Sequence, residues 1–336
     1  MKNPLVSVLI VNWNGADVLT PCIGSLINQS YKQIEIIVVD NNSSDNSREL
    51  LAKYKQIKLI ASSQNLGFAG GNNLAYTKAK GKYVLLLNTD TIVTKNFLEE
   101  LVSEIEQDTS LGIVQPKVLY ENGTINSLGA FLTSTGFLYY PGYGKKDHLP
   151  LYNKETYIFS AYGACMLISR KVIDKIGLFD PDYFMYFEET DFCMRVWLSG
   201  WKIKYTPKSL IHHKGGISSK KFGLEKIYFH SFKNRMCTYL KNLDVISLLK
   251  ILPIHLLICE GISLIYLFTG KVSFFIAVQK AFFWNISNLG SIYKKRRYIQ
   301  KDLRQVRDNN YLPIILQSPR LSYYLYLFKG LQYYKD

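Results

Sequence analysis

The sequence contains little cysteine and lacks several common motifs. Its five cysteines are odd in number and scattered, and no two form a Cys-x-x-Cys pair: Cys22, Cys165, Cys193, Cys237 and Cys259. This spacing argues against a disulfide framework and against a zinc site, and it favours a reducing compartment. No internal repeat is apparent. No signal peptide is expected, because the first residues lead directly into a short apolar run at 6–11.

Acidic residues are scarce in the last third of the chain. Residues 216–336 hold 19 Lys and Arg against 6 Asp and Glu, whereas residues 1–215 hold 22 against 20, within a net charge of +15. A near-neutral body with a basic region suggests an anionic partner, either nucleic acid or acidic lipid, and a solvated basic face is the alternative. At 48% hydrophobic and 20% charged residues, the chain is globular rather than disordered.

Apolar runs and helical patterns alternate along the first 216 residues. Strands are expected at 6–11, 35–39, 57–61, 82–88, 164–169, 203–206 and 210–211, and helices at 17–28, 47–54, 94–106 and 184–197. A glycine-rich loop at 65–73 leads into a further helix ending at 79, and residues 111–150 suit short, partly antiparallel strands. This order predicts an α/β fold with a largely parallel sheet. The texture becomes long, helical and apolar after residue 216, which predicts a boundary there between parts 1–216 and 217–336.

The strand at 82–88 ends in Asn88-Thr89-Asp90. Ligands of open α/β sheets bind outside the carboxyl ends of the strands, and a carboxylate there suits a hard divalent cation that carries substrate phosphates. An Asx turn or a helix N-cap is the structural alternative.

Two further segments follow strands. Asp40, with Asn42 and Asp45, could hydrogen-bond a base or a ribose, although helix capping explains the same residues. The loop 65–73 could cradle a phosphate with its backbone N–H groups. It is neither a G-x-G-x-x-G motif nor a P-loop, so this signal is weak alone.

The stretch 187–191 contains three carboxylates, Glu188, Glu189 and Asp191. Carboxylates this close repel one another, so raised pKa values are expected and one of them could serve as a general base. An acidic first helical turn is the alternative. His212 and His213 follow a strand, where an imidazole is a suitable metal ligand.

These segments together resemble family 2 inverting glycosyltransferases of the GT-A fold, in their rhamnosyltransferase-like branch. The resemblance covers about two thirds of the chain and rests on an ordered set of motifs: 8–15 (VLIVNWNG), 38–45 (VVDNNSSD), 65–73 (NLGFAGGNN), 86–90 (LLNTD), 163–167 (GACML), 187–195 (FEETDFCMR), Gly200-Trp201 and 213–216 (HKGG). Each motif is modest, and the order makes the set specific.

The resemblance implies a role for each matching residue. Asp40 would contact the nucleotide, Asp90 and His213 (or His212) would hold Mg²⁺ or Mn²⁺, and Glu189 would deprotonate the acceptor, with Glu188 as its rival and Asp191 and Arg195 as supports. The nucleotide-diphosphate sugar donor would lie against Asn12, Asp40, Asn42, Asp45, Asn65, Gly67, Gly70, Gly71, Asn72 and Asn88. The family's metal triplet is often Asp-x-Asp, so Asn88 replaces the first acid here, and Glu189 replaces the usual Asp.

The basic C-terminal part contains the apolar segments 245–268 and 274–292. Internal charges at Lys250 and Glu260 favour amphipathic helices over a spanning helix. The cluster 293–298 (YKKRRY) beside them suits anionic lipid head groups, so a peripheral position on the cytoplasmic face of the cell membrane is expected. No RNA-binding signature accompanies the basic tract, so nucleic acid is not expected as a partner. The sequence is compatible with a homo-oligomer.

The expected function is transfer of a sugar, rhamnose or similar, to a glycan or lipid-linked saccharide in cell-surface polysaccharide synthesis. By resemblance, thymidine-diphosphate rhamnose is the first candidate donor and uridine-linked sugars are next. Two alternatives stay open. A nucleotidyltransferase would want a glycine-rich loop and a lysine near the N-terminus, where Asn12-Trp13-Asn14-Gly15 stands instead. A degenerate sugar-binding module would explain Asn88.

Overall fold

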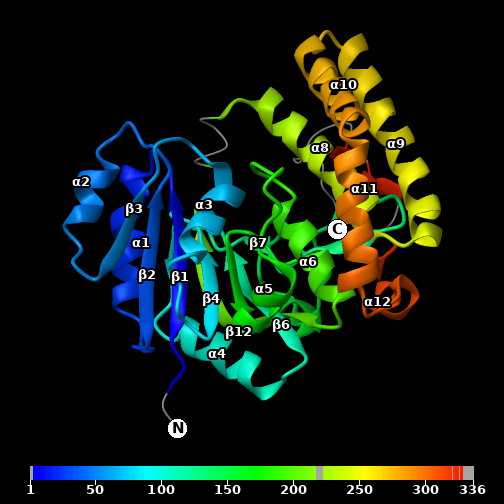
Figure 1. Cartoon of the computed structure of the whole chain (residues 1–336). Helices are drawn as coiled ribbons and strands as arrows, with labels where there is room; N and C mark the ends of the chain where they lie inside the picture. Colours follow the sequence, from blue (N-terminus) through cyan, green and yellow to red (C-terminus); the bar gives the residue numbers. More distant parts are fainter. Residues whose placement is uncertain (1–2, 217–221, 320, 325, 328–336) are drawn as a thin grey trace.

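A computed structural model describes residues 3–216, 222–319, 321–324 and 326–327. Its main sheet has the strand order β10-β12-β6-β11-β4-β1-β2-β3, with β5 beside β12 and β7 beside β6 (Figure 1). The strands of this sheet are β1 (Val6–Asn12), β2 (Ile34–Asp40), β3 (Ile57–Ala61), β4 (Tyr83–Leu87), β5 (Thr91–Val93), β6 (Leu111–Leu119), β7 (Ile125–Ser127), β10 (Thr156–Tyr157), β11 (Cys165–Ser169) and β12 (Lys202–His213). Strands β3, β2, β1 and β4 run parallel, and so do β6 and β12, whereas β11 runs antiparallel between β4 and β6.

Helices cover both faces of this sheet, which explains why its central strands are continuously apolar. In β1, Val8 and Ile10 pack in one buried cluster with α1 (Ala16–Ile27) and α4 (Phe97–Gln107), and Leu9 packs in the other. The second cluster lies against α3 (Gly67–Tyr76), α5 (Arg170–Ile176) and α6 (Glu188–Leu198). The short α2 (Ser47–Ala52) lies on the side of α1.

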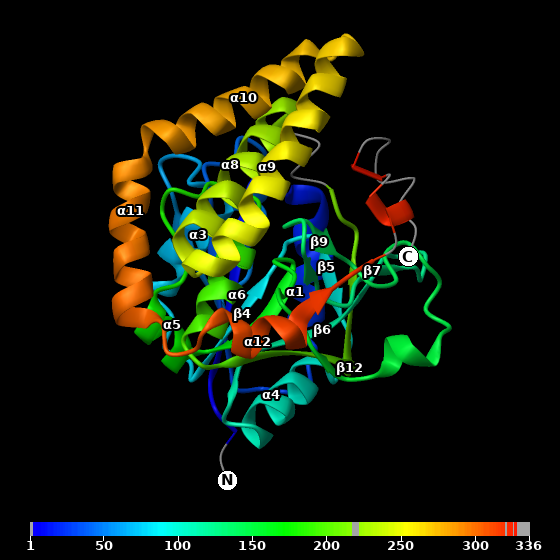
Figure 2. The same cartoon turned by 90° about the vertical axis from the view of Figure 1, so that its right-hand side faces the viewer.

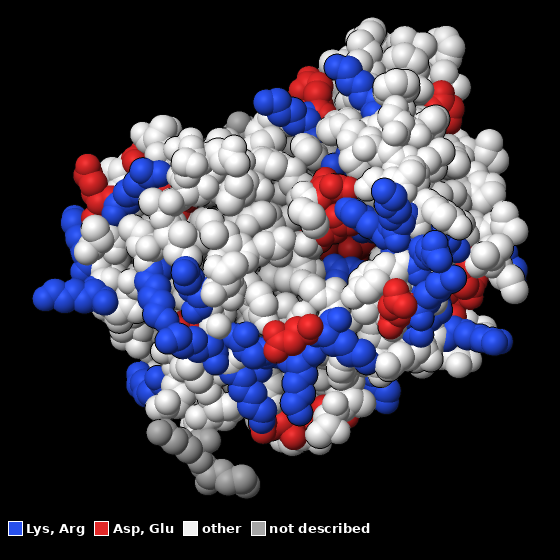
Figure 3. All heavy atoms as spheres, viewed as in Figure 1, with Lys and Arg blue, Asp and Glu red and all other residues white. Residues whose placement is uncertain are grey.

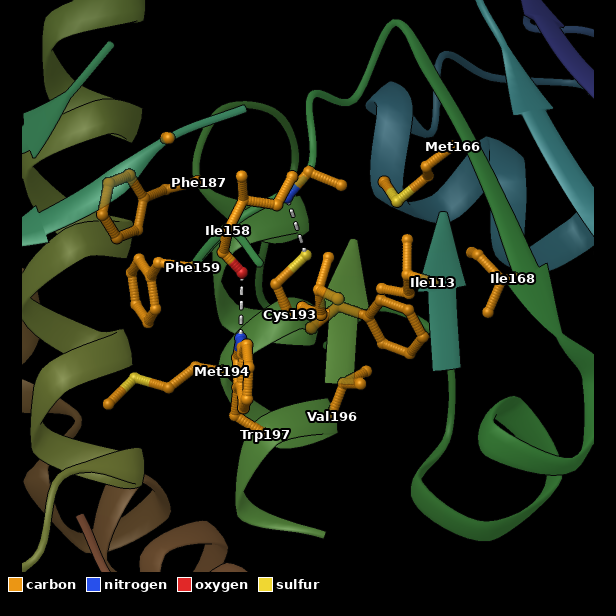
Figure 4. Close-up of a cluster of buried hydrophobic side chains, with 14 of the residues drawn as sticks. Ile113, Ile158, Phe159, Met166, Ile168, Phe187, Cys193, Met194, Val196 and Trp197 are labelled. Carbon is orange, nitrogen blue, oxygen red and sulfur yellow. Dashed lines mark hydrogen bonds between the residues drawn. The ribbon is translucent and has the colours of Figure 1, made fainter. Parts of the chain in front are cut away.

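Helix α6 carries the acidic segment and is fixed in the core (Figure 4). The indole N–H of Trp197 donates to the carbonyl of Ile158 at 3.2 Å, and the backbone N–H of Ala161 donates to the sulfur of Cys193 at 3.3 Å. Ten of the eleven residues of α6 are buried, Glu189 being the exception. A helix held on nearly all sides presents its first turn in a fixed position.

The structure differs from several of the expected elements; the helix expected at 184–197, for example, begins at Glu188. The glycine-rich segment 65–73 is largely the first turns of α3 rather than a loop. The two short strands expected at 203–206 and 210–211 form one long strand, β12, whose register against β6 shifts between Thr206 and Leu210. Residues 111–150 contain the nine-residue β6 followed by the short β7, β8 (Phe131–Thr133) and β9 (Leu138–Tyr139). Strands β8 and β9 form a small second sheet with β13 (Leu316–Gln317).

The C-terminal region is helical, as expected. It contains α8 (Leu224–Asn242), α9 (Val245–Phe268), α10 (Val272–Ser287), α11 (Leu289–Tyr298), a π-helical turn (Ile299–Leu303) and α12 (Asp308–Ile315). Short 3₁₀ turns cover Pro150–Asn153 and Leu321–Tyr324. Helix α8 packs against α6, and α9 and α10 form a lobe that projects from the body (Figure 2). Cys237, Tyr239 and Ile251 belong to the same buried cluster as residues of the sheet, and the division at residue 216 stays a prediction.

Helix α9 differs from the amphipathic helix that the sequence predicts. Its outward face is nearly all apolar, with Leu249, Leu257 and Phe268 exposed by 69, 74 and 83%, whereas its packed face includes the polar residues His255 and Ser263. Among the described residues it is the one helix long and apolar enough to cross a membrane by length and composition, and 28% of its apolar window is buried. The expected amphipathic pattern is therefore not the one this helix shows, and its association with a membrane stays a prediction.

Candidate active site

A cavity of about 280 Å³ opens at the carboxyl ends of β1, β2 and β4. Seven residues singled out from the sequence line it: Asn65, Gly67, Asn88, Asp90, Glu188, Glu189 and His213. Other lining residues were not singled out: Val11, Trp13, Asn41, Phe68, Thr89, Tyr162, Gly163, Ala164, Phe184, Met185, Tyr186, Gly216 and Phe222. The fold thus brings the end of β4, the end of β12 and the start of α6 to one cavity.

Asp90 and His213 meet because β5 pairs with the end of β12. The register sets His213 opposite Thr91, directly after Asp90, and the imidazole Nε2 lies 3.1 Å from Asp90 Oδ1. Nδ1 lies 2.7 Å from the side-chain oxygen of Asn126, a buried residue of β7, so this nitrogen is the one that donates. Nε2 is then left with its lone pair toward the cavity. His212 projects from the opposite side of the strand and does not line the cavity.

The pair fits a divalent cation held jointly with a phosphate-bearing substrate. Within the described residues, Nε2 of His213 is buried beside Asp90 and makes no hydrogen bond, as expected of a ligand atom whose partner is a metal ion. No group of three or more His, Cys, Asp or Glu side chains within the described parts of the chain could hold a metal alone. Mg²⁺ commonly takes one or two protein ligands and completes its shell with water and substrate phosphate, which suits this two-residue arrangement.

Asp40 lies beneath the cavity at the end of β2. Its carboxylate accepts from Asn12 Nδ2 at 3.2 Å and from the backbone N–H of Ser43 at 3.3 Å, and it pairs with Arg48. Burial opposes its charge, but the hydrogen bonds from Ser43, Arg48 and Asn12 prevail and lower the pKa of Asp40. Asn41, the next residue, does line the cavity. The predicted contact between Asp40 and a nucleotide stays a prediction.

The other polar residues after β2 hold the backbone. Asp45 accepts from the backbone N–H groups of Ala16 and Ser47 at 3.0 and 3.1 Å, which is the capping role weighed as the alternative. Asn42 adopts a left-handed φ of 63° in the turn. Neither residue lines the cavity.

The glycine-rich segment contributes mainly close packing. A side chain on Gly67, which has a φ of +70°, would meet the carbonyl oxygen of Phe184 at 2.2 Å, and one on Gly71 would meet Val11 at 2.6 Å. Gly70 and Asn72 also lie outside the cavity, and the Asn72 amide donates to the carbonyl of Phe68. Of the predicted phosphate loop, Asn65, Gly67 and Phe68 line the cavity.

Glu188 and Glu189 begin α6, and both line the cavity. Burial raises the pKa of Glu189 to about 7, against the opposing effect of backbone hydrogen bonds. Burial, and then the charge of Glu189, raise the pKa of Glu188 well above its usual range. One oxygen of each carboxyl group has no hydrogen-bond partner in the part of the chain that the structure describes. A carboxylate with a pKa near neutrality is suited to general base catalysis.

Asp191 points away from the cavity into a buried ion-pair network. It accepts from Arg195 Nε at 3.0 Å and from Asn242 Nδ2 at 2.8 Å, and Lys241 Nζ lies 3.0 Å from it. Burial opposes its ionisation, but Lys241 and Arg195 lower the pKa of Asp191. The geometry fits a support for α6, as predicted for Asp191 and Arg195, rather than contact with substrate.

Aromatic residues from distant segments complete the cavity wall. The rings of Trp13 and Phe222 lie 5.4 Å apart, and Phe222 lies 5.2 Å from Phe184. Of these three aromatic residues, Trp13 is the one whose position is recognisable from the sequence, because it directly follows the strand that ends at Asn12. Such rings can stack on a nucleobase or on the apolar face of a sugar.

Comparison with known proteins gives consistent results. Residues 7–177 match the profile of Glycosyl transferase family 2. The low-salt glycan biosynthesis hexosyltransferase Agl10 of Haloferax volcanii is 32% identical over 199 residues, which cover 56% of this chain and 61% of Agl10. The match therefore spans less than two thirds of that relative.

Solved structures share the fold at low sequence identity. S. aureus TarS 1-349 in complex with UDP-GlcNAc superposes with a TM-score of 0.58 at 16% identity over 92% of this chain and 90% of TarS 1-349. The mannosyltransferase PcManGT of Pyrobaculum calidifontis, in complex with GDP-Man and Mn²⁺, gives 0.54 at 14% identity over 89% and 86%. The expected GT-A-type fold, a mixed and mostly parallel sheet with flanking helices, is confirmed.

Proposed function

Because the chain belongs to glycosyl transferase family 2, we propose that it transfers a sugar from a nucleoside-diphosphate donor to a hydroxyl of a glycan or lipid-linked saccharide, with inversion at the anomeric carbon, in cell-surface polysaccharide synthesis. One observation carries the proposal: the Asp90–His213 pair and a glutamate with a pKa of about 7 line the same cavity. The first group suits a metal-bound diphosphate, and the second suits removal of a proton from an acceptor hydroxyl.

Each residue has a defined task in this proposal. Asp90 and Nε2 of His213 hold Mg²⁺ or Mn²⁺, and the tautomer that leaves Nε2 available is fixed by Asn126. A bound divalent cation supplies Lewis-acid stabilisation of the charge that develops on the departing diphosphate. Glu189 accepts the proton of the acceptor hydroxyl as the new glycosidic bond forms, and Trp13 offers an aromatic face to the donor nucleobase.

For the donor, we propose rhamnose carried on thymidine diphosphate, with uridine-linked sugars as the second candidate. The support is the resemblance of the ordered motifs to the rhamnosyltransferase-like branch. TarS and PcManGT, which share the fold, were crystallised with UDP-GlcNAc and with GDP-Man, so the fold itself accommodates several nucleotides.

Calorimetric titration with thymidine, uridine and guanosine diphosphates, each with and without Mn²⁺, tests the donor site. We expect metal-dependent binding of one nucleotide, lost in Asp90→Ala and retained in Asp17→Ala, a matched change at an exposed aspartate of α1. Binding that ignores the metal would contradict the metal-dependent mechanism. Turnover of the corresponding nucleotide sugar then separates an enzyme from a degenerate binding module, for which binding without turnover is the expected result.

We also propose that the protein lies peripherally on the cytoplasmic face of the cell membrane. On the face seen in Figure 3, the lobe of α9 and α10 shows few charged side chains. The lobe exposes Leu257, Phe268 and Phe283 by 74, 83 and 71%. Exposed Lys294 and Arg297 on α11 follow it in the chain and suit anionic head groups. Flotation with anionic vesicles, with neutral vesicles as the control, tests this placement. We expect salt-sensitive binding to the anionic vesicles, and the double variant Leu257→Glu with Phe268→Glu should lose this binding. If the same amount of protein is found in the floated fraction with and without vesicles at low salt, the proposed membrane placement is refuted.

A further inference from the structure

The chain enters α6 through a backbone conformation that bulky residues avoid. Tyr186 and Phe187, directly before the two glutamates, have φ angles of 65° and 69°. The left-handed conformation costs an L-residue on the order of 1–2 kcal/mol, and two consecutive aromatic residues in it need outside support. This support decides where Glu188 and Glu189 point, because they are the next residues along the chain.

The support comes from α8, beyond the family match. The side-chain Nδ2 of Asn234 donates to the carbonyl oxygens of Met185 at 3.0 Å and Tyr186 at 2.6 Å. Asn234 is fully buried, and its backbone carbonyl oxygen accepts a hydrogen bond from the Tyr183 hydroxyl at 3.0 Å. One side chain therefore holds two consecutive carbonyls of the strained turn.

Neighbouring residues of α8 hold the same segment at its two ends. Lys233 Nζ donates to the carbonyl of Asp182 at 2.7 Å. The ring of Tyr239 packs edge-on against Phe187, with the ring centres 6.0 Å apart. The segment is thus held from one helix at both ends and in the middle, and Asn234 is the member that hydrogen-bonds the left-handed Tyr186 and the residue before it.

We infer that Asn234 is a positioning residue for the transfer reaction, holding the left-handed turn that aims Glu189 into the cavity. The inference rests on the proposed function and assigns the C-terminal region a part in catalysis. Asn234 does not line the cavity and contacts neither Asp90 nor His213. The cavity residues that it holds, Met185 and Tyr186, are not among those assigned to the donor, so donor binding and transfer should separate when it is changed.

The test compares Asn234→Ala with Asn285→Ala. Asn285 of α10 is also buried and donates through Nδ2 to two backbone carbonyls, those of Lys233 and Ala281, but it contacts no residue of the 182–189 segment in those bonds. We expect Asn234→Ala to lower kcat by about 10–100-fold, the usual effect of removing a group that orients a reacting residue. The acid limb of its pH profile should also move, because the surroundings of Glu189 change, while Asn285→Ala should keep both near wild type.

Nucleotide binding in the presence of Mn²⁺ is the second readout. Its Kd should stay within about threefold of wild type in Asn234→Ala, because the donor residues are untouched. Asn234→Ser keeps one hydrogen-bond donor, so its kcat should lie between those of wild type and Asn234→Ala. If the alanine variant does not fold, the serine variant replaces it in the test. A folded Asn234→Ala with wild-type kcat and pH profile, or an equal loss in Asn285→Ala, would overturn the inference alone. A wild-type protein that turns over no nucleotide sugar would overturn the proposed function and this inference with it.

Discussion

Replacing Glu189 with Gln gives the most direct test of the proposed chemistry. The substitution keeps the size of the side chain and removes its ability to accept a proton. General base catalysis contributes about 10²–10⁴-fold, which corresponds to roughly 2.7–5.5 kcal/mol of transition-state free energy. We therefore expect kcat to fall by that factor while metal-dependent nucleotide binding persists.

The pH profile of the wild-type enzyme adds an independent check. Because burial raises the pKa of Glu189 to about 7, kcat should rise with pH through that region and level off once the carboxylate is ionised. Glu189→Gln should lose this limb of the profile. A steady-state assay of nucleoside diphosphate release across pH measures both quantities.

Glu188→Gln distinguishes the two adjacent glutamates. Burial and the charge of Glu189 raise the pKa of Glu188 and so favour its neutral form, which a neutral amide resembles; Glu188→Gln should therefore change kcat by less than about tenfold. Glu189→Gln with a wild-type rate would refute the assignment of the base. A large loss in Glu188→Gln together with a small loss in Glu189→Gln would transfer the role to Glu188.

Three further predictions concern stability and metal binding. The pKa of Glu189 is about 7 in the folded protein and near 4.3 in the unfolded chain, so the folded state loses stability as pH rises between these two values. Glu189→Gln should therefore melt at a higher temperature than wild type above neutral pH, and should not do so at acid pH. Lys241→Met removes one of the two cations that pair with buried Asp191, the other being Arg195, and should cost up to about 3–5 kcal/mol in urea unfolding. Lys58→Met breaks a pair whose lysine is half exposed and should cost about 0–1 kcal/mol. Pairing lowers the pKa of Asp191, so the Lys241 contribution should disappear as pH falls below about 4, and an equal loss in both variants would contradict the argument. Asn126→Ala should weaken Mn²⁺ binding by about 10–100-fold in an electron paramagnetic resonance titration, and unchanged affinity would show that Asn126 does not orient His213.

The parallel half of the sheet could be read from the sequence because its strands are buried on both faces. Strands β1, β2, β3 and β4 are short apolar runs that end in polar residues, so their positions follow from the pattern. Strand β12 could not be read as one element. Its lysines at 204 and 208 interrupt the apolar pattern because both pair with Glu104 and Glu155.

The acidic and imidazole residues of the site could be anticipated for the same reason. Asp90 and His213 directly follow or end strands, and such positions meet at one edge of the sheet. The glycines at 67–71 were misread because glycine is typical of loops, whereas here it permits close contact with Val11 and Phe184.

Residues contributed by tertiary contacts carried no such signal. Asn126 contacts His213, 87 positions away, and Asn234 donates to two carbonyls 48 and 49 positions away. No local spacing in the sequence indicates a partner at that separation. Phe222 enters the cavity wall from beyond the boundary that the sequence predicted. The acid–base chemistry was therefore visible in the sequence, while the groups that orient it were not.

The left-handed turn before α6 also has a consequence for synthesis of the chain. Translation delivers Asp90, Glu189 and His213 before any residue of α8. On the inference above, a growing chain gains the residues that bind a sugar nucleotide first and gains the side chain that aims its base only later. Because Cys237 and Tyr239 of α8 also belong to the buried cluster that includes the sheet, transfer requires the part of the chain that is synthesised last of these elements.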